Sequence, residues 1–311
     1  MQTILGANGQ IAEELARELH RNYTTDIRLV SRNPKKVNDT DELFSANLLD
    51  GEATDNAVKG SHIVYLTVGL PMDSKIWEEQ FMIIMHNVIR ACKNQKCKLV
   101  FFDNTYMYPK TSESQTEETP FLPVGTKSEV RAEIAGMLLD EIKKNTIEAL
   151  ICRAPEFYGP GKTQSITNSL IFDNIQKNKK LKVPLKDNTL RSLIWTSDAS
   201  RAMALLGNTP DAYGQTWHLP CDDNRLTYKE FINLISIIYQ KKLDYSIIRK
   251  WLFRVGGLFS KRMKELQELL PRYEVDNIFV SDKFQKKFPD FQITTFEEGI
   301  TRIMKEQNSL K

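Results

Sequence analysis

The first twelve residues, Met1 to Ala12, read MQTILGANGQIA and determine the fold expected for the chain. A short apolar run meets Gly6, and Gly9 stands just before an amphipathic run from Ile11 to Leu19. This order predicts a strand, a tight turn and a helix. Glycines let the backbone approach a ligand closely, and the first N–H groups of a helix attract anions, so a pyrophosphate site is expected here. The residues expected at that site are Gly6, Asn8, Gly9, Gln10 and Ile11.

The same alternation of apolar and helical stretches continues through the first half of the chain. Strands are expected at 2–5, 26–30, 42–46, 62–67, 98–102 and 148–152. Helices are expected at 10–21, 51–58, 75–94 and 126–144. Strands that alternate with helices predict an α/β fold, with a doubly wound parallel sheet and helices on both faces.

The second half is less regular, because Pro and Gly interrupt the chain after Cys152 in the stretch APEFYGPGK. Helices are expected at 165–178, 197–206, 227–240, 247–269, 281–288 and 295–307, with an extended piece at 189–195. We expect a smaller lobe near the carboxyl ends of the strands, where open α/β sheets bind ligands. The predicted domains are 1–155, with a returning segment near 189–206, and 156–311. The stretch TSESQTEET at 111–119 is expected to be a mobile loop.

The amino-acid composition disfavours several classes of protein. The 43 Lys and Arg and 40 Asp and Glu are mixed along the chain and give a net charge of +3, so we expect no nucleic-acid partner and no membrane partner. No apolar run approaches the roughly 20 residues of a membrane span, and the N-terminus lacks a signal-peptide pattern. The four cysteines lack CxxC spacing and are expected to be reduced core thiols of a cytoplasmic protein. No metal site is expected, because the histidines form no set with the cysteines.

The end of the expected second strand bears on the choice of dinucleotide. It reads LVSRNP at 29–34 and has no Asp or Glu. A carboxylate there would bond a free ribose 2′-hydroxyl and repel a 2′-phosphate, whereas Ser31 and Arg32 would do the reverse. The sequence therefore favours NADP over NAD. The alternative is that Arg32 is only a solvated turn residue.

Several motifs in order resemble those of one known family. They are GANGQIA (6–12), VSR (30–32), ANLLD (46–50), YLTVG (65–69), RAPEFYGPG (153–161), SLIWTSDASR (192–201) and GQTWHL (214–219). Together they resemble the extended short-chain dehydrogenase/reductases, the superfamily of NAD-dependent epimerases and dehydratases. The resemblance implies a Rossmann-type domain with a smaller C-terminal substrate domain. It also implies cofactor contacts from Asn47 and Leu48 at the adenine, and from Leu66, Thr67 and Val68 at the ribose and phosphates. Residues 67–69 are equally compatible with a simple strand end and turn.

The catalytic positions depart from the family pattern. Family members carry a Ser or Thr together with a Tyr and Lys spaced as YxxxK. Here the lysine is present as Lys127, but Pro123 occupies the tyrosine position, and Asn104 stands where the Ser or Thr is usual. Tyr106 is a candidate for the missing phenol; the alternative is that Tyr106 and Tyr108 only pack the loop. The resemblance implies that Lys127 holds the cofactor ribose, with proton donation as a second role.

Two residues in the second half are candidates for substrate contact. Glu156 stands where enzymes for nucleotide sugars commonly have an Asn that meets the diphosphate, and a carboxylate there would repel the phosphates. A nucleoside diphosphate sugar is therefore disfavoured. Glu156 is otherwise expected to bond a hydroxyl, bind a cation, act as a base or cap the GPGK turn. Arg191 is interpreted as either substrate-facing or structural.

The leading hypothesis is an NADP-dependent oxidoreductase or epimerase/dehydratase-type enzyme for a small molecule, using Lys127, Asn104 and Tyr106. The alternative is an NADPH-binding sensor or assembly protein without redox turnover, since the usual Tyr and Ser are absent. A homodimer through helices near 75–94 and 126–144 is expected from the resemblance, with Met82, Met85, Ile89, Met137 and Leu138 as contact candidates. The apolar stretch WLFRVGGLF at 251–259 either lines a hydrophobic substrate pocket or docks the C-terminal lobe.

Overall fold

The computed structural model describes residues 1–161 and 163–309. The chain forms two compact units, each built from separate segments. Unit 1 contains residues 1–107, 123–154 and 199–219, and unit 2 contains the rest of the described chain. Each unit is described by itself.

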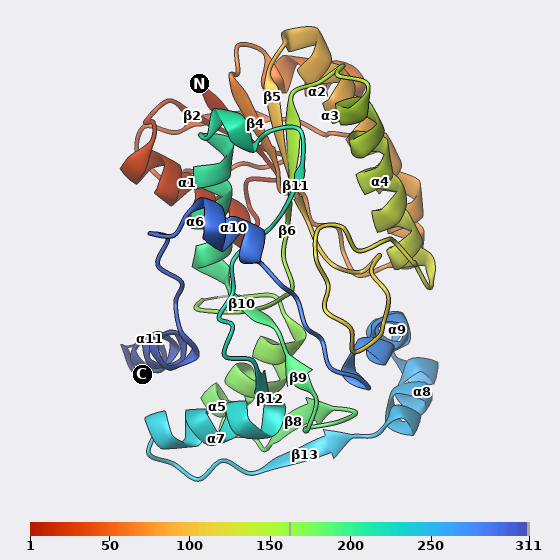
Figure 1. The fold of residues 1–311 in the computed structure, drawn as a ribbon, viewed down its shortest axis with the longest axis vertical. Coiled ribbons are helices and arrows are strands. Elements are labelled where there is room, and N and C mark those ends of the chain that lie inside the picture. Colours follow the sequence, from red (N-terminus) through yellow and green to blue (C-terminus); the bar gives the residue numbers. More distant parts are fainter. Residues whose placement is uncertain (162, 310–311) are drawn as a thin grey trace. The chain divides into compact units, whose positions relative to one another are not determined.

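Unit 1 is built on a parallel sheet (Figure 1). Its strands are β1 (Gln2–Leu5), β2 (Ile27–Ser31), β3 (Glu42–Ser45), β4 (Ile63–Leu66), β5 (Lys98–Asp103), β6 (Ala149–Arg153) and β11 (Thr216–His218). Within the described residues the sheet has seven strands in the order β11-β6-β5-β4-β1-β2-β3. Strands β1, β4 and β6 are buried along their whole length, as expected for a parallel sheet covered on both faces. The order changes direction between β1 and β4, and this confirms the doubly wound, Rossmann-like fold.

Helices cover both faces of this sheet. They are α1 (Gln10–Asn22), α2 (Gly51–Val58), α3 (Ser74–Gln95), α4 (Thr126–Lys143) and α6 (Thr196–Gly207), with the short η2 (Pro210–Ala212). Figure 1 shows α2, α3 and α4 on one side of the sheet and α1 and α6 on the other. Asp50 and Asp73 cap α2 and α3 with their carboxylates, whereas α1 and α4 begin after a glycine that offers no side-chain cap. The first N–H groups of α1 and α4 are therefore not bonded by a capping side chain, whereas those of α2 and α3 are.

Unit 2 contains short sheets and helices. Its strands are β7 (Glu156–Tyr158), β8 (Leu181–Pro184), β9 (Leu190–Arg191), β10 (Leu193–Trp195), β12 (Leu226–Thr227) and β13 (Tyr245–Ile248), paired as β10-β7, β12-β9 and β13-β8. Its helices are η1 (Asn168–Phe172), α5 (Asp173–Gln176), α7 (Tyr228–Ile238), α8 (Lys250–Phe259), α9 (Lys261–Leu266), η3 (Gln267–Tyr273), α10 (Asp282–Lys287) and α11 (Phe296–Ser309). Small separate sheets of this kind match the C-terminal part expected from the resemblance.

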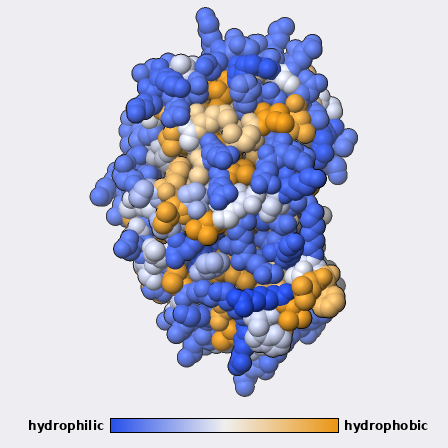
Figure 2. Space-filling view, turned by 90° about the vertical axis from the view of Figure 1, so that its right-hand side faces the viewer, coloured by the Kyte–Doolittle hydropathy of each residue, from blue (hydrophilic) through white to orange (hydrophobic). Residues whose placement is uncertain are grey.

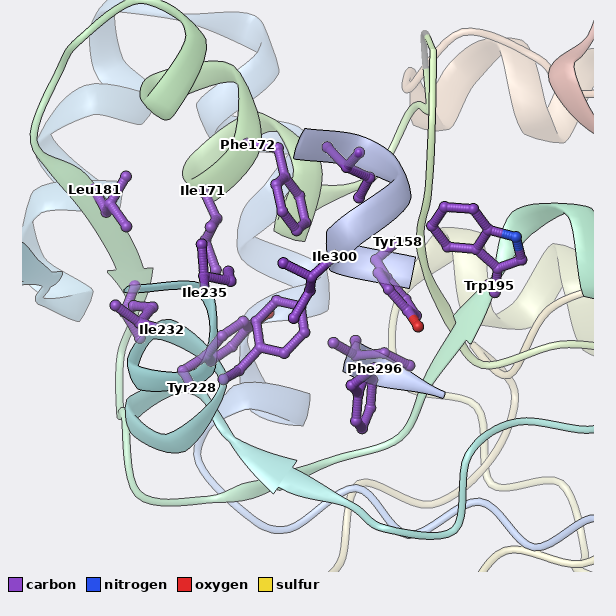
Figure 3. Close-up of a cluster of buried hydrophobic side chains, with 14 of the residues drawn as sticks. Tyr158, Ile171, Phe172, Leu181, Trp195, Tyr228, Ile232, Ile235, Phe296 and Ile300 are labelled. Atoms are coloured by element: carbon purple, nitrogen blue, oxygen red, sulfur yellow. The ribbon is translucent and has the colours of Figure 1, made fainter. Parts of the chain in front are cut away.

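Aromatic side chains form the core of unit 2 (Figure 3). The ring of Tyr158 lies 5.3 Å from that of Trp195 and 5.4 Å from that of Phe296, measured between centroids. Helix α11 approaches this cluster closely at Gly299, where an added Cβ would lie 2.6 Å from the Tyr158 hydroxyl oxygen. Unit 2 therefore has its own apolar core, independent of the parallel sheet.

Two local expectations are wrong. The helix expected at 247–269 is divided into β13, α8, α9 and η3, because Ile247 and Ile248 pair with β8 and Ser260 caps a new helix. The helix expected at 165–178 is confirmed to within two residues, because the chain is helical from 166 to 176, through η1 and α5. The stretch 111–119 is anchored at its centre: Gln115 is buried, its N–H donates to Ile278 O at 2.7 Å, and its carbonyl accepts from Val280 N at 2.9 Å.

The expected dimer contacts divide into two groups. Met85, Ile89 and Leu138 are buried inside unit 1, so they belong to its core. Met82 and Met137 are half-buried on the same helices, and the neighbouring Ile83 is exposed. A homodimer through α3 and α4 stays a prediction.

Other expectations concern the cysteines, a metal site and a membrane-spanning helix. Cys92, Cys97, Cys152 and Cys221 are buried and form no disulfide. Among the described residues, no group of three or more His, Cys, Asp or Glu is arranged to hold a metal ion. Within the same residues, no helix is both long and apolar enough to cross a membrane.

Candidate functional site

The glycine turn after β1 packs tightly against the end of β4. Gly6 has φ +95°, and an added Cβ would lie 2.8 Å from Val68 N and 2.9 Å from Val68 Cα. The turn is fixed to β2, because the N–H groups of Gly6 and Ala7 both donate to Val30 O, at 2.9 and 3.1 Å. Only glycine fits this backbone without strain.

Gly9 has a different role from Gly6. It precedes α1 in an extended conformation, and the nearest atom to an added Cβ is Gly6 O at 3.4 Å, an ordinary contact. Packing within the chain therefore does not require glycine at this position. A missing side chain beside an uncapped helix N-terminus leaves room for an anion at the Gln10 and Ile11 end of α1, which fits a pyrophosphate.

The tip of β2 lies beside this turn. The Asn8 side chain donates to Asn33 O at 2.8 Å, so it fixes the loop after β2. Arg32 is exposed, and Ser45 Oγ donates to its carbonyl at 2.8 Å. Among the described residues, no group bonds the buried Ser31 hydroxyl. A buried hydroxyl without a partner is uncommon, which makes Ser31 a candidate to bond a ligand at the tip of β2.

The remaining cofactor candidates lie along the same edge of unit 1. Asn47 is exposed, and its Oδ1 accepts from Leu49 N at 3.2 Å, whereas Leu48 is buried. Leu66 and Thr67 are buried, and the Thr67 hydroxyl donates to Leu5 O at 3.0 Å. This internal bond means that Thr67 offers a ligand its backbone rather than its hydroxyl. Val68 is half-buried beside Gly6.

Lys127, the second residue of α4, is fully buried. Its Nζ donates to the hydroxyl of Ser74 at 2.8 Å, and Ser74 is the first residue of α3. The lysine ammonium is therefore held where α3 begins. Sequence reasoning missed Ser74, although a hydroxyl at a helix start is a recognisable signal. Pro123 is half-buried between the exposed Leu122 and Val124, before α4 begins.

Asn104 and Tyr106 follow β5 in a tight turn. Asn104 Oδ1 accepts from Tyr106 N at 2.9 Å, so one side of the amide is used by the turn. The Tyr106 ring is half-buried and stacks on Trp77, with 6.1 Å between centroids and 8° between planes. Tyr108 is instead fully buried and contacts Phe121 in unit 2. The two tyrosines thus do not pack on each other: Tyr106 stacks on Trp77, and Tyr108 packs in unit 2. A catalytic role of Tyr106 stays a prediction.

A buried charge cluster lies at the ends of β5 and β6, next to Tyr106. Asp103 is fully buried, and its two carboxylate oxygens lie 3.1 Å from Arg131 Nε and 3.2 Å from Arg153 Nε. Both arginines are buried as well, so Asp103 has a guanidinium group at each of its carboxylate oxygens. We call these three residues the Asp103 cluster. Sequence reasoning missed it, although Asp103 and Arg153 are direct neighbours in the pairing of two apolar strands.

Arg131 connects this cluster to the aromatic side chains. Its guanidinium carbon lies 5.8 Å from the Trp77 ring centroid and 5.1 Å from that of Phe81. Burial lowers the pKa of Arg131, whereas Asp103 and then Tyr106 act to raise it. Tyr106 is therefore close enough to interact electrostatically with the guanidinium. A cation in this position favours the phenolate form of a tyrosine.

In unit 2, Glu156 has several partners within the chain. Oε1 accepts from the backbone N and the hydroxyl of Thr167, at 3.0 and 2.8 Å. Oε2 accepts from the Tyr273 hydroxyl at 2.8 Å and lies 3.8 Å from Arg191 Nη2. Arg191 is fully buried; it donates to Arg272 O at 2.6 Å, and its guanidinium carbon lies 4.6 Å from the centre of the Tyr273 ring. We call Glu156, Arg191, Thr167 and Tyr273 the Glu156 cluster.

This geometry corrects two expectations for Glu156. The carboxylate does not cap the turn at 159–161, where Gly161 N instead donates to Glu306 at 2.9 Å; Lys162 of that turn lies outside the described residues. The charge of Glu156 is also balanced by Arg191, so the repulsion argument against a substrate diphosphate loses its premise. Arg191 is structural in this arrangement.

Unit 2 holds further basic residues that sequence reasoning missed. Arg272 is buried beside the Glu156 cluster, and Lys110 Nζ donates to Tyr108 O at 2.8 Å. Burial, and then the positive charge of Arg272, lower the pKa of Lys110 from 10.5 to about 8, against the opposing charge of Glu268. A strongly lowered lysine pKa is a feature of many functional sites.

Comparison with known proteins agrees with this fold. Residues 3–219 match the family described as the NAD dependent epimerase/dehydratase family. The comparison with curated proteins found no match. Among solved structures, UDP-glucuronic acid 4-epimerase from Bacillus cereus in complex with NAD matches with a TM-score of 0.79 at 14% identity, over 100% of this chain and 99% of that one.

Two other solved structures agree. UDP-glucose 4-epimerase from Thermus thermophilus in complex with NAD has a TM-score of 0.77 at 14% identity, with 100% of both chains covered. dTDP-glucose 4,6-dehydratase from Bacillus anthracis in complex with NAD has a TM-score of 0.79 at 16% identity, over 99% of this chain and 96% of that one. At these identities the likeness shows the fold alone.

Proposed function

Because this chain belongs to the NAD-dependent epimerase/dehydratase family, we propose that it is an enzyme that binds NADP in unit 1 and oxidises, reduces or epimerises a small anionic molecule. The observation that carries the proposal is the edge of unit 1. Only glycine fits at Gly6, no side chain fills the space beside Gly9, and no group among the described residues bonds the Ser31 hydroxyl. A pyrophosphate at α1 and a ribose at β2 fit these three features.

The preference for NADP rests on the tip of β2. Ser31 and the exposed Arg32 offer a hydroxyl and a guanidinium, and no carboxylate follows them in the stretch up to residue 38. These groups are suited to a 2′-phosphate. Arg32→Ala is expected to weaken NADPH binding about tenfold or more and to leave NADH binding nearly unchanged. The control is Arg302→Ala, an exposed arginine on α11.

The proposed chemistry uses residues at the end of β5. When bound, the dinucleotide supplies a centre that accepts and returns hydride. Tyr106 takes the proton from a substrate hydroxyl as the carbonyl forms, and returns it when the carbonyl is reduced. The guanidinium of Arg131 beside Tyr106 supports this role, with Arg131 as the positioning residue. The amide of Asn104 donates to the substrate oxygen, and Lys127 orients the cofactor ribose.

The substrate class follows from unit 2. Arg272 and Lys110 add positive charge beside a Glu156 that is already balanced, so an anionic group on the substrate is favoured. Because the charge of Glu156 is paired with Arg191, a substrate diphosphate is no longer disfavoured. The first compounds to test include UDP-glucuronic acid together with simple hydroxy acids and keto acids. Product formation is followed by mass spectrometry, because an epimerase returns its hydride and shows no net change in NADPH.

A second candidate function is NADPH sensing without turnover. It is favoured by Pro123 at the tyrosine position and by Lys127, whose ammonium bonds Ser74. Tyr106→Phe and Lys127→Ala separate the two proposals. Loss of product formation by at least about 100-fold in Tyr106→Phe, with NADPH binding retained, supports the enzyme. Unchanged activity in both variants would remove the proposed mechanism and favour the sensor.

A further inference from the structure

Helix α8 presents an apolar stripe to solvent. The stripe consists of Trp251, Leu252, Val255, Leu258 and Phe259. Trp251, Val255, Leu258 and Phe259 recur at the spacing of one helix face. Leu258 and Phe259 are 80% and 86% exposed, which is unusual for large apolar side chains. The interpretation of 251–259 as pocket lining or docking segment is therefore wrong for these residues.

The opposite face of α8 is packed, so the helix has a defined orientation. Phe253 is buried. An added Cβ at Gly257 would lie 2.3 Å from Gln267 Nε2, and one at Gly256 would lie 2.4 Å from Met263 Sδ. The two glycines thus let α9 and η3 pack closely behind α8. The stripe on the outer face is consequently held in place, rather than being one side of a loose segment.

Basic residues surround the stripe. Between 241 and 264 the sequence holds eight Lys and Arg and one Asp, and between 177 and 186 it holds five Lys and no acid. The two segments are neighbours, because β8 pairs with β13 and places the exposed Lys182 opposite Ser246. Arg249, Arg254 and Lys261 are exposed around the helix itself.

Acidic residues on the packed side reduce this charge only in part. Lys250 pairs with Glu274 at 2.9 Å, and Glu265 and Glu268 lie on α9 and η3. Since the whole chain has nearly equal numbers of acidic and basic residues, the positive charge around α8 is a local concentration. Figure 2 shows hydrophobic side chains gathered at the lower right of that face, at the height of α8 in Figure 1, next to strongly hydrophilic ones.

An apolar stripe with a Trp and a Phe, bordered by Lys and Arg, has the chemistry of a helix that lies in the interface of a bilayer. Anionic headgroups would neutralise the basic border while the stripe leaves water. A second copy of this chain is a poorer occupant, because it would bring the same positive charges together. We propose that α8 docks this protein reversibly on a lipid surface that carries anionic headgroups. The proposal replaces the sequence-based expectation of no membrane partner and does not depend on the proposed enzyme activity.

Tryptophan fluorescence provides a direct test with the full chain. Trp77, Trp195 and Trp217 are buried, whereas Trp251 is 56% exposed and sits on the stripe. With vesicles of phosphatidylcholine and about one third phosphatidylserine, the emission should shift to the blue, and brominated acyl chains should quench it. Vesicles of phosphatidylcholine alone should bind at least about tenfold more weakly, and about 0.5 M salt should release the protein.

Matched variants identify the stripe as the contact. The double substitution Leu258→Ser with Phe259→Ser should reduce vesicle binding about tenfold or more, as measured by co-sedimentation. Ile237→Ser, which changes a 64% exposed residue on α7, should leave it unchanged. Arg254→Glu with Lys261→Glu should also abolish binding. Because all these positions are exposed, the fold should be retained, and circular dichroism checks this.

Three results would overturn the proposal. The first is a protein that does not bind the phosphatidylserine vesicles at low salt. The second is a dimer in sedimentation velocity that the Leu258 and Phe259 substitutions dissociate, which would assign the stripe to a second copy. The third is binding to heparin that matches vesicle binding and is insensitive to those substitutions, which would reduce the site to a polyanion contact.

Discussion

The two buried charge clusters differ in what surrounds the carboxylate. Asp103 lies between the guanidinium groups of two buried arginines, and Tyr106 lies next to one of them, Arg131. Glu156 lies 3.8 Å from Arg191 and accepts hydrogen bonds from Thr167 and Tyr273, so both of its oxygens are used within the chain. A buried cation can act on a neighbouring polar group, whereas a carboxylate whose oxygens are bonded within the chain holds elements together. The first cluster is therefore suited to chemistry and the second to stability.

The largest loss of unfolding free energy is expected for Asp103→Asn. The substitution leaves two buried arginines without a counter-charge, which costs about 3–5 kcal/mol of unfolding free energy. Urea denaturation measures the loss, with Asp140→Asn as the exposed control on α4. A loss below about 1 kcal/mol would show that water or another group already screens the arginines.

A second comparison replaces the arginine in each cluster. Arg191→Met leaves Glu156 buried without its cation and should cost about 2–4 kcal/mol. Arg131→Met leaves the neutral pair of Asp103 and Arg153 and should cost only about 1 kcal/mol. Turnover should respond in the reverse order, with a loss of about 100-fold for Arg131→Met once a substrate is known. Equal stability losses in thermal denaturation would remove the distinction between the clusters.

Glu156→Gln is expected to lower the unfolding free energy moderately. The amide keeps part of the hydrogen bonding to Thr167 and Tyr273 but loses the charge beside Arg191, so a loss of about 1–3 kcal/mol is expected. Substrate KM should stay within about twofold, because the carboxylate bonds the chain and not the substrate. An increase in KM at unchanged stability would instead place Glu156 in contact with the substrate.

The smallest effect on the fold concerns Lys110. With its pKa lowered to about 8, its amine should react with acetic anhydride half-maximally near that pH, well below an ordinary lysine, as read by peptide mass spectrometry. The folded protein holds this proton less tightly than the unfolded chain does. The contribution of Lys110 to stability should thus rise as pH increases from about 8 to about 10.5. Half-reaction above about pH 10 would contradict the effect of Arg272 and burial.

The fold could be predicted from sequence because its signals are local. The glycine turn after β1 and the alternating apolar runs predict all strands of the main sheet up to β6 to within about one residue. Gly6 and Lys127 are candidates because they lie inside motifs, and their roles stay predictions. The family match confirms the family that those motifs indicate.

The partners within the candidate site could not be predicted in the same way, because they come from distant parts of the chain. Tyr273, which bonds Glu156, is 117 residues away in sequence, and Ser74, which bonds Lys127, is 53 residues away. The helix expected at 247–269 does not form as one element, because Ile247 and Ile248 have their pairing partner in β8, far from them in sequence. Tertiary pairing overrides a local helical pattern in such stretches.

We propose that unit 1 is a dinucleotide site whose β2 tip receives a 2′-phosphate. The measurement that tests it most directly is calorimetric titration of the full chain with NADPH and with NADH. We expect NADPH to bind at micromolar concentration and at least about tenfold more tightly than NADH, and Ser31→Asp to reverse the preference. Tighter binding of NADH, or no binding of either below about millimolar concentration, would contradict the account.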